Sequence, residues 1–217
     1  VGEFGRGRVL DTPLSEAGFI GAAAGAALTG LRPIAELMFV DFLGVCFDSI
    51  YNQAAKFRYM FGGTASAPLV VRTAIGAGMR VGAQHSQSLY SLFTHVPGLK
   101  CVMPSGAYDA KGLLTQAIRD DDPVIFFEHK LLFDVAEEVP DESYTIPFGE
   151  ANIVRDGGDV TIIGLSRMVH VASEAAEKMA ADGIQCQIID PRTISPLDTE
   201  SIIESVENTG RLVIVDE

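Results

Sequence analysis

The chain contains no tryptophan and only three cysteines among its 217 residues. Cys46, Cys101 and Cys186 lie far apart in apolar segments, which indicates reduced core thiols rather than a zinc site or a disulfide framework. Basic residues are also scarce, since 16 Lys and Arg stand against 29 Asp and Glu and leave a net charge of -13. Binding to nucleic acid needs clustered Lys and Arg, so we expect no nucleic-acid partner and a cytoplasmic protein.

No hydrophobic run has the length of a membrane span. The longest uncharged stretch, residues 17–31, has 15 residues, whereas a transmembrane helix needs about 20. The first residues also lack the basic start and apolar run of a signal peptide. We therefore expect no contact with a membrane. Because the sequence starts without Met and ends in a strand-like run, we expect truncation at both ends.

Segments typical of strands alternate with segments typical of helices. Continuous apolar runs predict buried strands at 33–39, 68–72, 100–103, 124–128, 160–164, 186–190 and 211–215. The expected helices are residues 13–30, 41–59, 87–93, 108–119, 169–181 and 199–206. This alternation predicts an α/β fold with a parallel sheet flanked by helices. The acidic, aperiodic stretch 134–144 predicts an exposed connector, so we expect two domains, 1–140 and 141–217, with their boundary near 138–146.

Two titratable residues are candidates for chemistry. Glu16 lies in the first turn of the apolar helix for which Thr12 is the expected cap. Its carboxylate is either a charge that favours the helix start or a partly desolvated acid. His85 follows the glycine-rich loop 76–82 and is either a surface residue or a group that transfers protons.

The segments Asp11-Thr12-Pro13-Leu14-Ser15-Glu16 and Gln84-His85-Ser86-Gln87-Ser88 resemble the thiamine-diphosphate-dependent β subunits of 2-oxo acid and acetoin dehydrogenase complexes. The resemblance extends from about residue 8 to residue 217. It implies a domain that binds the pyrimidine half of the cofactor, N-terminally truncated, and then a C-terminally truncated domain like the C-terminal domain of transketolase.

The resemblance also assigns roles to individual residues. The glutamate of this motif, Glu16 here, donates a hydrogen bond to a ring nitrogen of the cofactor's aminopyrimidine. The histidine, His85 here, faces the reactive carbon and the incoming lipoyl group. An aromatic residue at the position of Phe42 stacks on the aminopyrimidine, and Leu14 lines the same pocket. Without the resemblance, Phe42 is an ordinary core residue.

The chain contains no Gly-Asp-Gly sequence of the kind that anchors thiamine diphosphate through Mg²⁺. The resemblance therefore implies that an α subunit holds the diphosphate and Mg²⁺ in an α₂β₂ heterotetramer. A β/β self-contact and a lipoyl-bearing acyltransferase component complete the expected partners. Ala117, Asp120 and Asp122 resemble a loop that in some relatives binds K⁺ through backbone carbonyls, although without the resemblance they indicate only an acidic turn.

Several motifs favour the acetoin member of the family, including Glu128-His129-Lys130 and Arg167-Met168-Val169-His170. We therefore expect cleavage of acetoin, release of acetaldehyde and transfer of the acetyl unit to lipoamide. The alternatives are a decarboxylating pyruvate or branched-chain 2-oxo acid dehydrogenase β subunit, and a non-catalytic scaffold subunit of such a complex. The proton transfers expected of Glu16 and His85 are nearly the same for all these substrates.

Overall fold

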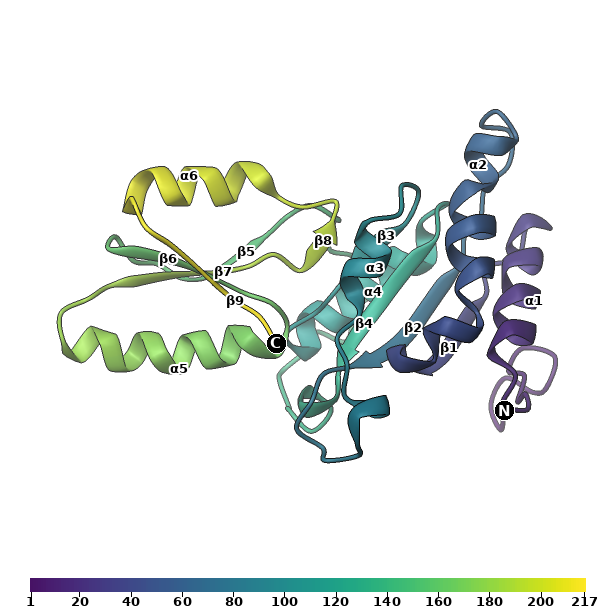
Figure 1. The fold of residues 1–217 in the computed structure, drawn as a ribbon, viewed down its shortest axis with the longest axis horizontal. Helices are drawn as coiled ribbons and strands as arrows, with labels where there is room; N and C mark the ends of the chain where they lie inside the picture. Colours follow the sequence, from purple (N-terminus) through teal and green to yellow (C-terminus); the bar gives the residue numbers. More distant parts are fainter.

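Two sheets organise the computed structural model, which describes residues 1–217 (Figure 1). The first sheet has the strand order β1 (Ile34–Phe39), β2 (Val70–Ile75), β4 (Val124–His129), β3 (Lys100–Val102) and β8 (Thr193–Ser195). The second has the order β5 (Asn152–Arg155), β7 (Cys186–Asp190), β6 (Val160–Gly164) and β9 (Leu212–Val215). The expected α/β class is confirmed, with both parallel and antiparallel pairs.

The first sheet buries alternate residues on opposite faces, as the pleat of a strand requires. Val71 and Phe127 belong to the larger core, together with α1 (Glu16–Leu28), the helical stretch 40–60 and α3 (Tyr90–Thr94). Their sequence neighbours on β2 and β4 point the other way and pack against α4 (Ala107–Arg119). The sheet is thus covered on both faces, as a buried parallel sheet requires.

The single helix expected at 41–59 is wrong in detail. The stretch consists of the 3₁₀ turn η1 (Val40–Val45), the π turn η2 (Asp48–Gln53), the 3₁₀ turn η3 (Ala54–Lys56) and the short helix α2 (Phe57–Met60). Glycine and β-branched residues in its first turns have low helix propensity, so packing against the sheet determines the local geometry. A π turn of this kind is rare and is often found near functional sites.

Helix α1 begins at Glu16, and its N-cap is Ser15, not Thr12. The Ser15 hydroxyl donates to the carbonyl of Pro13 at 3.2 Å instead of capping the helix. Although the whole helix is apolar, only the stripe of Ile20, Ala24 and Ala27 is buried. Because most of its residues are Ala or Gly, the sequence has no polar stripe that would reveal the outward face.

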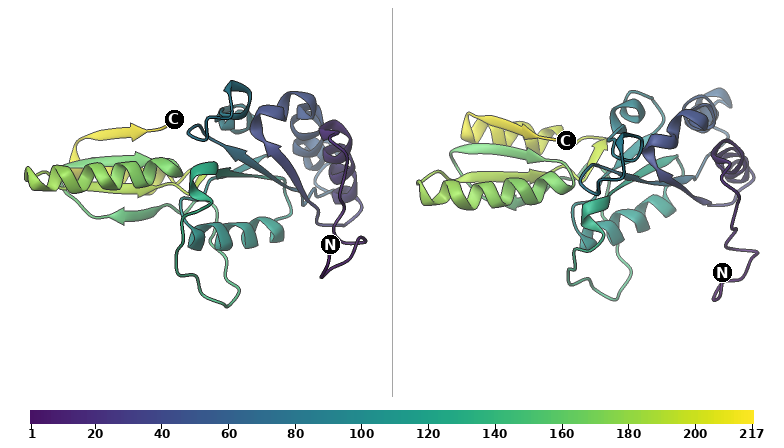
Figure 2. Two further views of the ribbon diagram at one scale, coloured as in Figure 1. Left: turned by 90° about the horizontal axis from the view of Figure 1, so that it is seen from below. Right: turned by 60° about the horizontal axis from the view of Figure 1, so that its bottom comes forward.

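The second sheet lies between two helices, α5 (Arg167–Ala181) and α6 (Thr199–Thr209) (Figure 2). Helix α5 covers an apolar core, whereas α6 meets the sheet through a buried hydroxyl cluster in which Thr161 Oγ1 lies 2.7 Å from both Ser205 Oγ and Thr209 Oγ1. Strand β5 was not expected, because its residues are half exposed and too few to form a pattern. No helix in the structure has both the length and the apolar character needed to cross a bilayer.

Strand β8 lies within the sequence of the second unit, between β7 and α6, but pairs antiparallel with β3 of the first sheet. Buried polar contacts reinforce this junction. The Ser105 hydroxyl donates to the carboxylate of Asp190, and the Arg192 guanidinium lies 2.9 Å from Asp109. His170 Nε2 contacts the Ser105 carbonyl at 2.7 Å. The two units are therefore joined by a strand pair as well as by side chains.

Asp190 makes the stability of this junction dependent on pH. Burial raises the pKa of its carboxyl group to about 6. The folded state therefore binds the proton more tightly than the unfolded state, and the contribution of Asp190 to stability falls as pH rises from about 4 to about 6. Two units of pKa correspond to about 3 kcal/mol. We expect the free energy of unfolding of D190N minus that of the parent, measured with urea, to be larger at pH 7 than at pH 4.5. The increase should be up to that amount. Equal differences at both pH values would contradict this.

Candidate functional site

Three loops meet where β1, β2 and β4 end. Parallel strands present their carboxyl ends at one edge of a sheet, which is where α/β proteins bind ligands. The rings of Phe39, Phe42 and His85 meet there edge to face, with His85 5.0 Å from Phe39 and 5.4 Å from Phe42. Contacts of this geometry are worth about 0.5–1.5 kcal/mol each beyond their buried area. The structure thus brings two of the expected site residues, Phe42 and His85, into contact.

The loop that carries His85 leaves β2 at Gly76, whose φ is +93°. A Cβ atom built on Gly76 would lie only 2.1 Å from His129 Nε2, so glycine is required here for space as well as for backbone conformation. The Gly76 amide also donates to the carbonyl of Gln87 at 3.1 Å. The glycine-rich loop thereby folds back so that Gln87 contacts Gly76. His85 lies on the loop between these two residues.

Two charged residues of the site were not predicted. Lys130 follows β4 and is only 4% exposed, and its ammonium donates to the carbonyl of His85. Asp41 Oδ1 accepts from Gln87 Nε2 at 2.7 Å, and its other oxygen is buried without a hydrogen-bond partner. Burial lowers the pKa of Lys130, while the carboxylates of Asp41 and Glu217 oppose this shift. The sequence feature that could have identified Lys130 and Asp41 was their position directly after apolar strands.

Glu16 lies on α1, which packs against the turn that carries Phe42. It is half buried in the first turn of the helix, and η1, which carries Phe42, contacts both α1 and the turn η4 (Ala83–His85). Burial, with a smaller effect of the Glu16 charge, raises the pKa of the Cys46 thiol to about 11. In contrast, Leu14 is 83% exposed.

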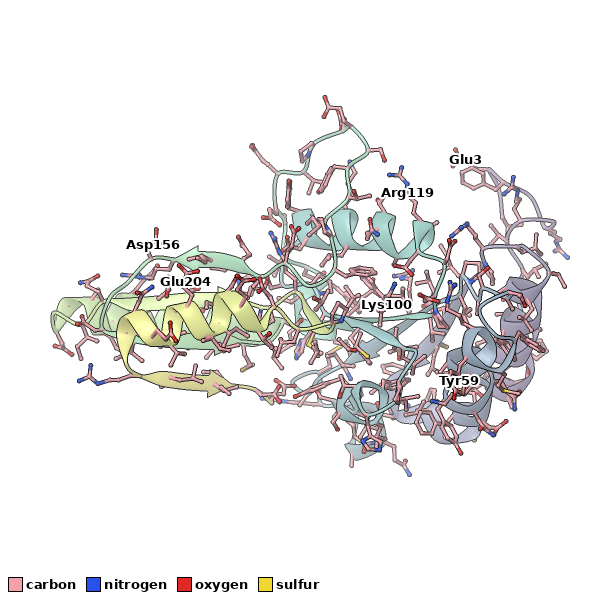
Figure 3. The ribbon with its side chains drawn as sticks, turned by 90° about the horizontal axis from the view of Figure 1, so that it is seen from above. Glu3, Tyr59, Lys100, Arg119, Asp156 and Glu204 are labelled. Atoms are coloured by element: carbon pink, nitrogen blue, oxygen red, sulfur yellow. The ribbon has the colours of Figure 1, made fainter.

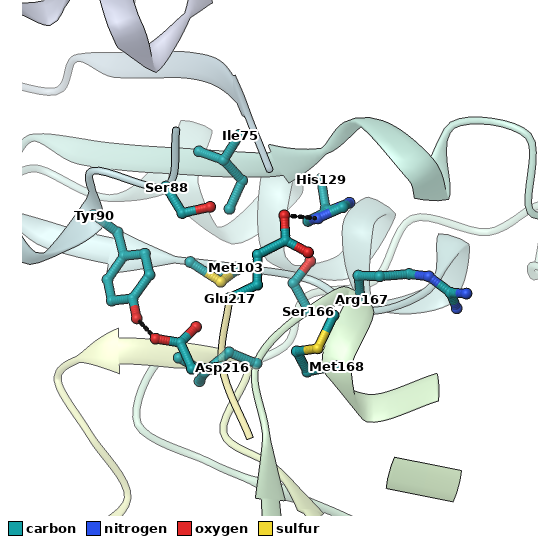
Figure 4. A pocket seen from close by; sticks show the side chains of 11 residues that line it. Ile75, Ser88, Tyr90, Met103, His129, Ser166, Arg167, Met168, Asp216 and Glu217 are labelled. Carbon is teal, nitrogen blue, oxygen red and sulfur yellow. Dashed lines mark hydrogen bonds and ion pairs between the residues drawn. The ribbon is translucent and has the colours of Figure 1, made fainter. Parts of the chain in front are cut away.

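A small cavity lies beside the site, at the junction of the two units (Figure 4). Its wall includes His129, whose Nδ1 accepts from the Leu131 amide at 3.2 Å, so the proton of the neutral ring is assigned to Nε2. Nε2 then donates to Glu217 Oε1 at 3.2 Å. Burial lowers the pKa of His129, so this contact is a hydrogen bond of a neutral imidazole rather than an ion pair.

The loop suggested for K⁺ is already neutralised by basic side chains. The Lys100 ammonium lies 2.6 Å from Asp120 Oδ1, and Arg58 Nε lies 2.5 Å from Asp122 Oδ1. Two backbone carbonyls of the loop accept from Arg32, and the Ala117 carbonyl accepts from the Asp120 amide at 3.3 Å. In this conformation the residues do not fit a cation, and we derive no role for K⁺. Nowhere in the chain do three or more His, Cys, Asp or Glu side chains form a metal-binding group.

A larger hollow of about 930 Å³ opens at the opposite, amino end of the first sheet. It is lined by Lys56, Gly98 and Lys100, and by Tyr59, which projects from α2 (Figure 3). This hollow lies at the start of β3, away from His85. It therefore belongs to a different surface of the molecule.

The site contains polar groups that the chain does not satisfy. One oxygen of Asp41 has no hydrogen-bond partner, and the buried ammonium of Lys130 makes one hydrogen bond although it has three donors. Buried polar groups are normally paired, so these groups fit a ligand with polar edges beside an aromatic wall. The aminopyrimidine half of thiamine diphosphate has this character. No Gly-Asp-Gly sequence accompanies the site for the diphosphate half.

Comparisons with known proteins identify the family of the chain. Residues 1–135 match the transketolase pyrimidine-binding domain, and residues 149–217 match the transketolase C-terminal domain. The chain is 66% identical to the acetoin:2,6-dichlorophenolindophenol oxidoreductase subunit beta of Cupriavidus necator, over 97% of this chain and 62% of the relative. It is 60% identical to the Bacillus subtilis protein of the same name, over 100% of this chain and 64% of the relative.

More distant relatives have other names. The pyruvate dehydrogenase E1 component subunit beta of Rickettsia felis is 53% identical over 99% of this chain and 66% of its own length. A solved structure described as a split gene transketolase, inactive beta4 tetramer, superimposes with a TM-score of 0.78 at 26% identity, covering 94% of this chain and 63% of that one. The chain thus spans just under two thirds of the length of these relatives.

Proposed function

Since this chain belongs to the family that joins a transketolase pyrimidine-binding domain to a transketolase C-terminal domain, we propose that it is part of the β subunit of a thiamine-diphosphate-dependent acetoin dehydrogenase. The observation that carries the proposal is the packing of His85 against Phe42 at the carboxyl ends of the strands, on the turn η1 that α1, the helix of Glu16, also contacts. The unpaired polar groups of Asp41 and Lys130 support a polar ligand at the same place.

Each residue has one task in this proposal. When bound, the cofactor supplies a nucleophilic carbon for attack on a carbonyl group. Glu16 holds a proton against a ring nitrogen of the aminopyrimidine, and the ring of Phe42 lies against its face. His85 exchanges a proton with the substrate oxygen as charge develops there, a task that suits imidazole near neutral pH. Leu14 is proposed to line the pocket only in the assembled enzyme, because this chain leaves it exposed.

Acetoin is the proposed substrate. Cleavage of its central carbon–carbon bond releases acetaldehyde, and the remaining two-carbon unit is oxidised to an acetyl group on lipoamide. Greater identity to the two acetoin-named relatives than to the pyruvate-named one supports this choice. A pyruvate or branched-chain 2-oxo acid substrate, which would lose CO₂ instead, is the second candidate. A scaffold without catalysis is the third, and the retained Glu16 and His85 count against it.

The proposal includes partners. An α subunit holds the diphosphate and Mg²⁺, two copies of each chain form α₂β₂ with a β/β contact, and a lipoyl-bearing acyltransferase accepts the acetyl unit. The names of the relatives, which call them beta subunits, support a partner chain. The uncovered, small-residue face of α1 is apolar enough to take part in such contacts. A cytoplasmic location is also proposed, supported by three free, buried cysteines.

The full-length subunit alone is expected to bind thiamine diphosphate weakly, because the diphosphate half of the site lies on the partner. Isothermal titration with Mg²⁺ should give no tight site for the β subunit alone and a tight site for the complex co-expressed with its α subunit. Micromolar binding to the β subunit alone would contradict the shared site. A complex that binds the cofactor but turns over neither acetoin nor a 2-oxo acid would indicate the scaffold. Competition between acetoin, pyruvate and branched-chain 2-oxo acids then identifies the substrate.

A further inference from the structure

The His85 loop is held by contacts from three different strand ends. The carbonyl of His85 accepts from Lys130 after β4, and the backbone and side chain of Gln87 donate to Asp41 after β1. The Gly76 amide at the end of β2 donates to the Gln87 carbonyl. Of these anchors, only Lys130 acts on His85 itself.

Lys130 is an unusual anchor, because its ammonium is buried at high cost. Its single hydrogen-bond acceptor is the His85 carbonyl, and no carboxylate lies within ion-pair distance of it. The charge lies 5.2 Å from the centre of the Phe39 ring, which is favourable cation–π geometry. Phe39 in turn contacts the His85 ring. Lys130 therefore touches both the backbone of His85 and the wall that its imidazole packs against.

We propose that Lys130 is a positioning residue for His85. By donating to the His85 carbonyl and lying over Phe39, it fixes both ends of the residue, the main chain and the ring. The imidazole is thus held in place before substrate arrives. The expected effect on kcat rests on the proposed function. The anchoring of His85 by Lys130 rests only on contacts within this chain.

The test uses the full-length β subunit co-expressed with its α subunit. In K130M the side chain keeps its length and loses its charge and donors, so His85 is no longer fixed. A displacement of about 1 Å can cost about 10²-fold in rate. We therefore expect kcat to fall by roughly that factor with little change in KM. Exchange of the cofactor's thiazolium proton with deuterated water, which depends on Glu16, should stay near the parent rate.

A matched control is available at the other end of the sheet. Lys56 also donates to a backbone carbonyl, that of Pro97 at 3.0 Å, and lies beside the amino-end hollow. K56M removes the same type of contact and should leave kcat within about twofold, because it is remote from the chemistry. K130R keeps charge and donors and should recover part of the K130M loss, although arginine does not reproduce lysine geometry. If K130M does not assemble, Lys130→Gln replaces it, since its shorter amide should lose the contact and show the same fall in kcat.

A double-mutant cycle separates positioning from a general structural role. If Lys130 acts through His85, K130M should cost little further activity in an H85A background. An equal loss in both backgrounds, or a parental kcat for K130M, would overturn the proposal. Deuterium uptake of the β subunit within the complex supplies a readout independent of activity, and K130M, but not K56M, should raise uptake across residues 82–88. If the parent complex has no thiamine-dependent turnover but uptake rises as expected, the proposed function fails and the anchoring by Lys130 stands; unchanged uptake overturns the anchoring.

Discussion

Replacing Glu16 with Gln should abolish most of the enzyme's ability to activate its cofactor. Gln has nearly the same size, but its amide cannot hold the acidic proton that the proposed role requires. General acid–base groups contribute about 10²–10⁴-fold, so we expect the exchange of the thiazolium proton with deuterated water to slow by that order in the complex. Folding should change little, because Gln is nearly the same size as Glu and Glu16 is only half buried.

Glu200 is a matched control for this substitution. It lies in the first turn of α6, as Glu16 does in α1, but belongs to the second unit. E200Q should alter stability by a few tenths of a kcal/mol through the helix dipole and leave proton exchange at the parent rate. If E16Q behaves like E200Q, Glu16 is only a charge at a helix start and the proposed mechanism is wrong.

The largest loss of stability is expected from Gly98→Ala. Gly98 has φ of +98°, and a Cβ atom there would lie 2.1 Å from the backbone oxygen of Ala55. The backbone conformation costs an L-residue about 1–2 kcal/mol, and forcing packed segments apart costs about 1–3 kcal/mol more. We therefore expect urea unfolding to show a loss of about 2–5 kcal/mol.

Gly158→Ala provides the comparison, because a Cβ atom on Gly158 would have no other atom within 4 Å and the residue does not need a positive φ. Its substitution should change the free energy of unfolding by less than about 0.5 kcal/mol, as for most surface sites. A Gly98→Ala protein as stable as Gly158→Ala would show that the segment of η3 around Ala55 moves aside without cost.

Strands that are buried on both faces were predictable because their sequences are continuously apolar. Strand β4, with Val124 to Phe127 all buried, is the clearest example. Strand β8 was not predictable, since its three residues carry no apolar pattern and its pairing with β3 depends on the chain's path in space. The irregular turns η1 to η3 were missed for a related reason: their form depends on packing against the sheet and on low local helix propensity.

The candidate site also combines residues that the sequence predicted with residues that it did not. The motifs that carry the family resemblance assigned both His85 and Phe42 to one cofactor site, and the structure shows their rings in contact. Lys130 and Asp41 were missed because a charged residue at the end of a strand normally lies in solvent. Only the three-dimensional structure reveals that loops from β1, β2 and β4 close over both of them.

The antiparallel pairing of β8 with β3 has a consequence for how the molecule folds. Residues 193–195 complete the edge of a sheet whose other strands all come from residues before 130. The first sheet is therefore not finished until residues 193–195 have been synthesised, and until then the open edge of β3 is free to pair with another polypeptide. Such late closure between distant segments raises contact order and slows folding. During synthesis, the unpaired edge of β3 is therefore a site at which aggregation can begin until β8 docks onto it.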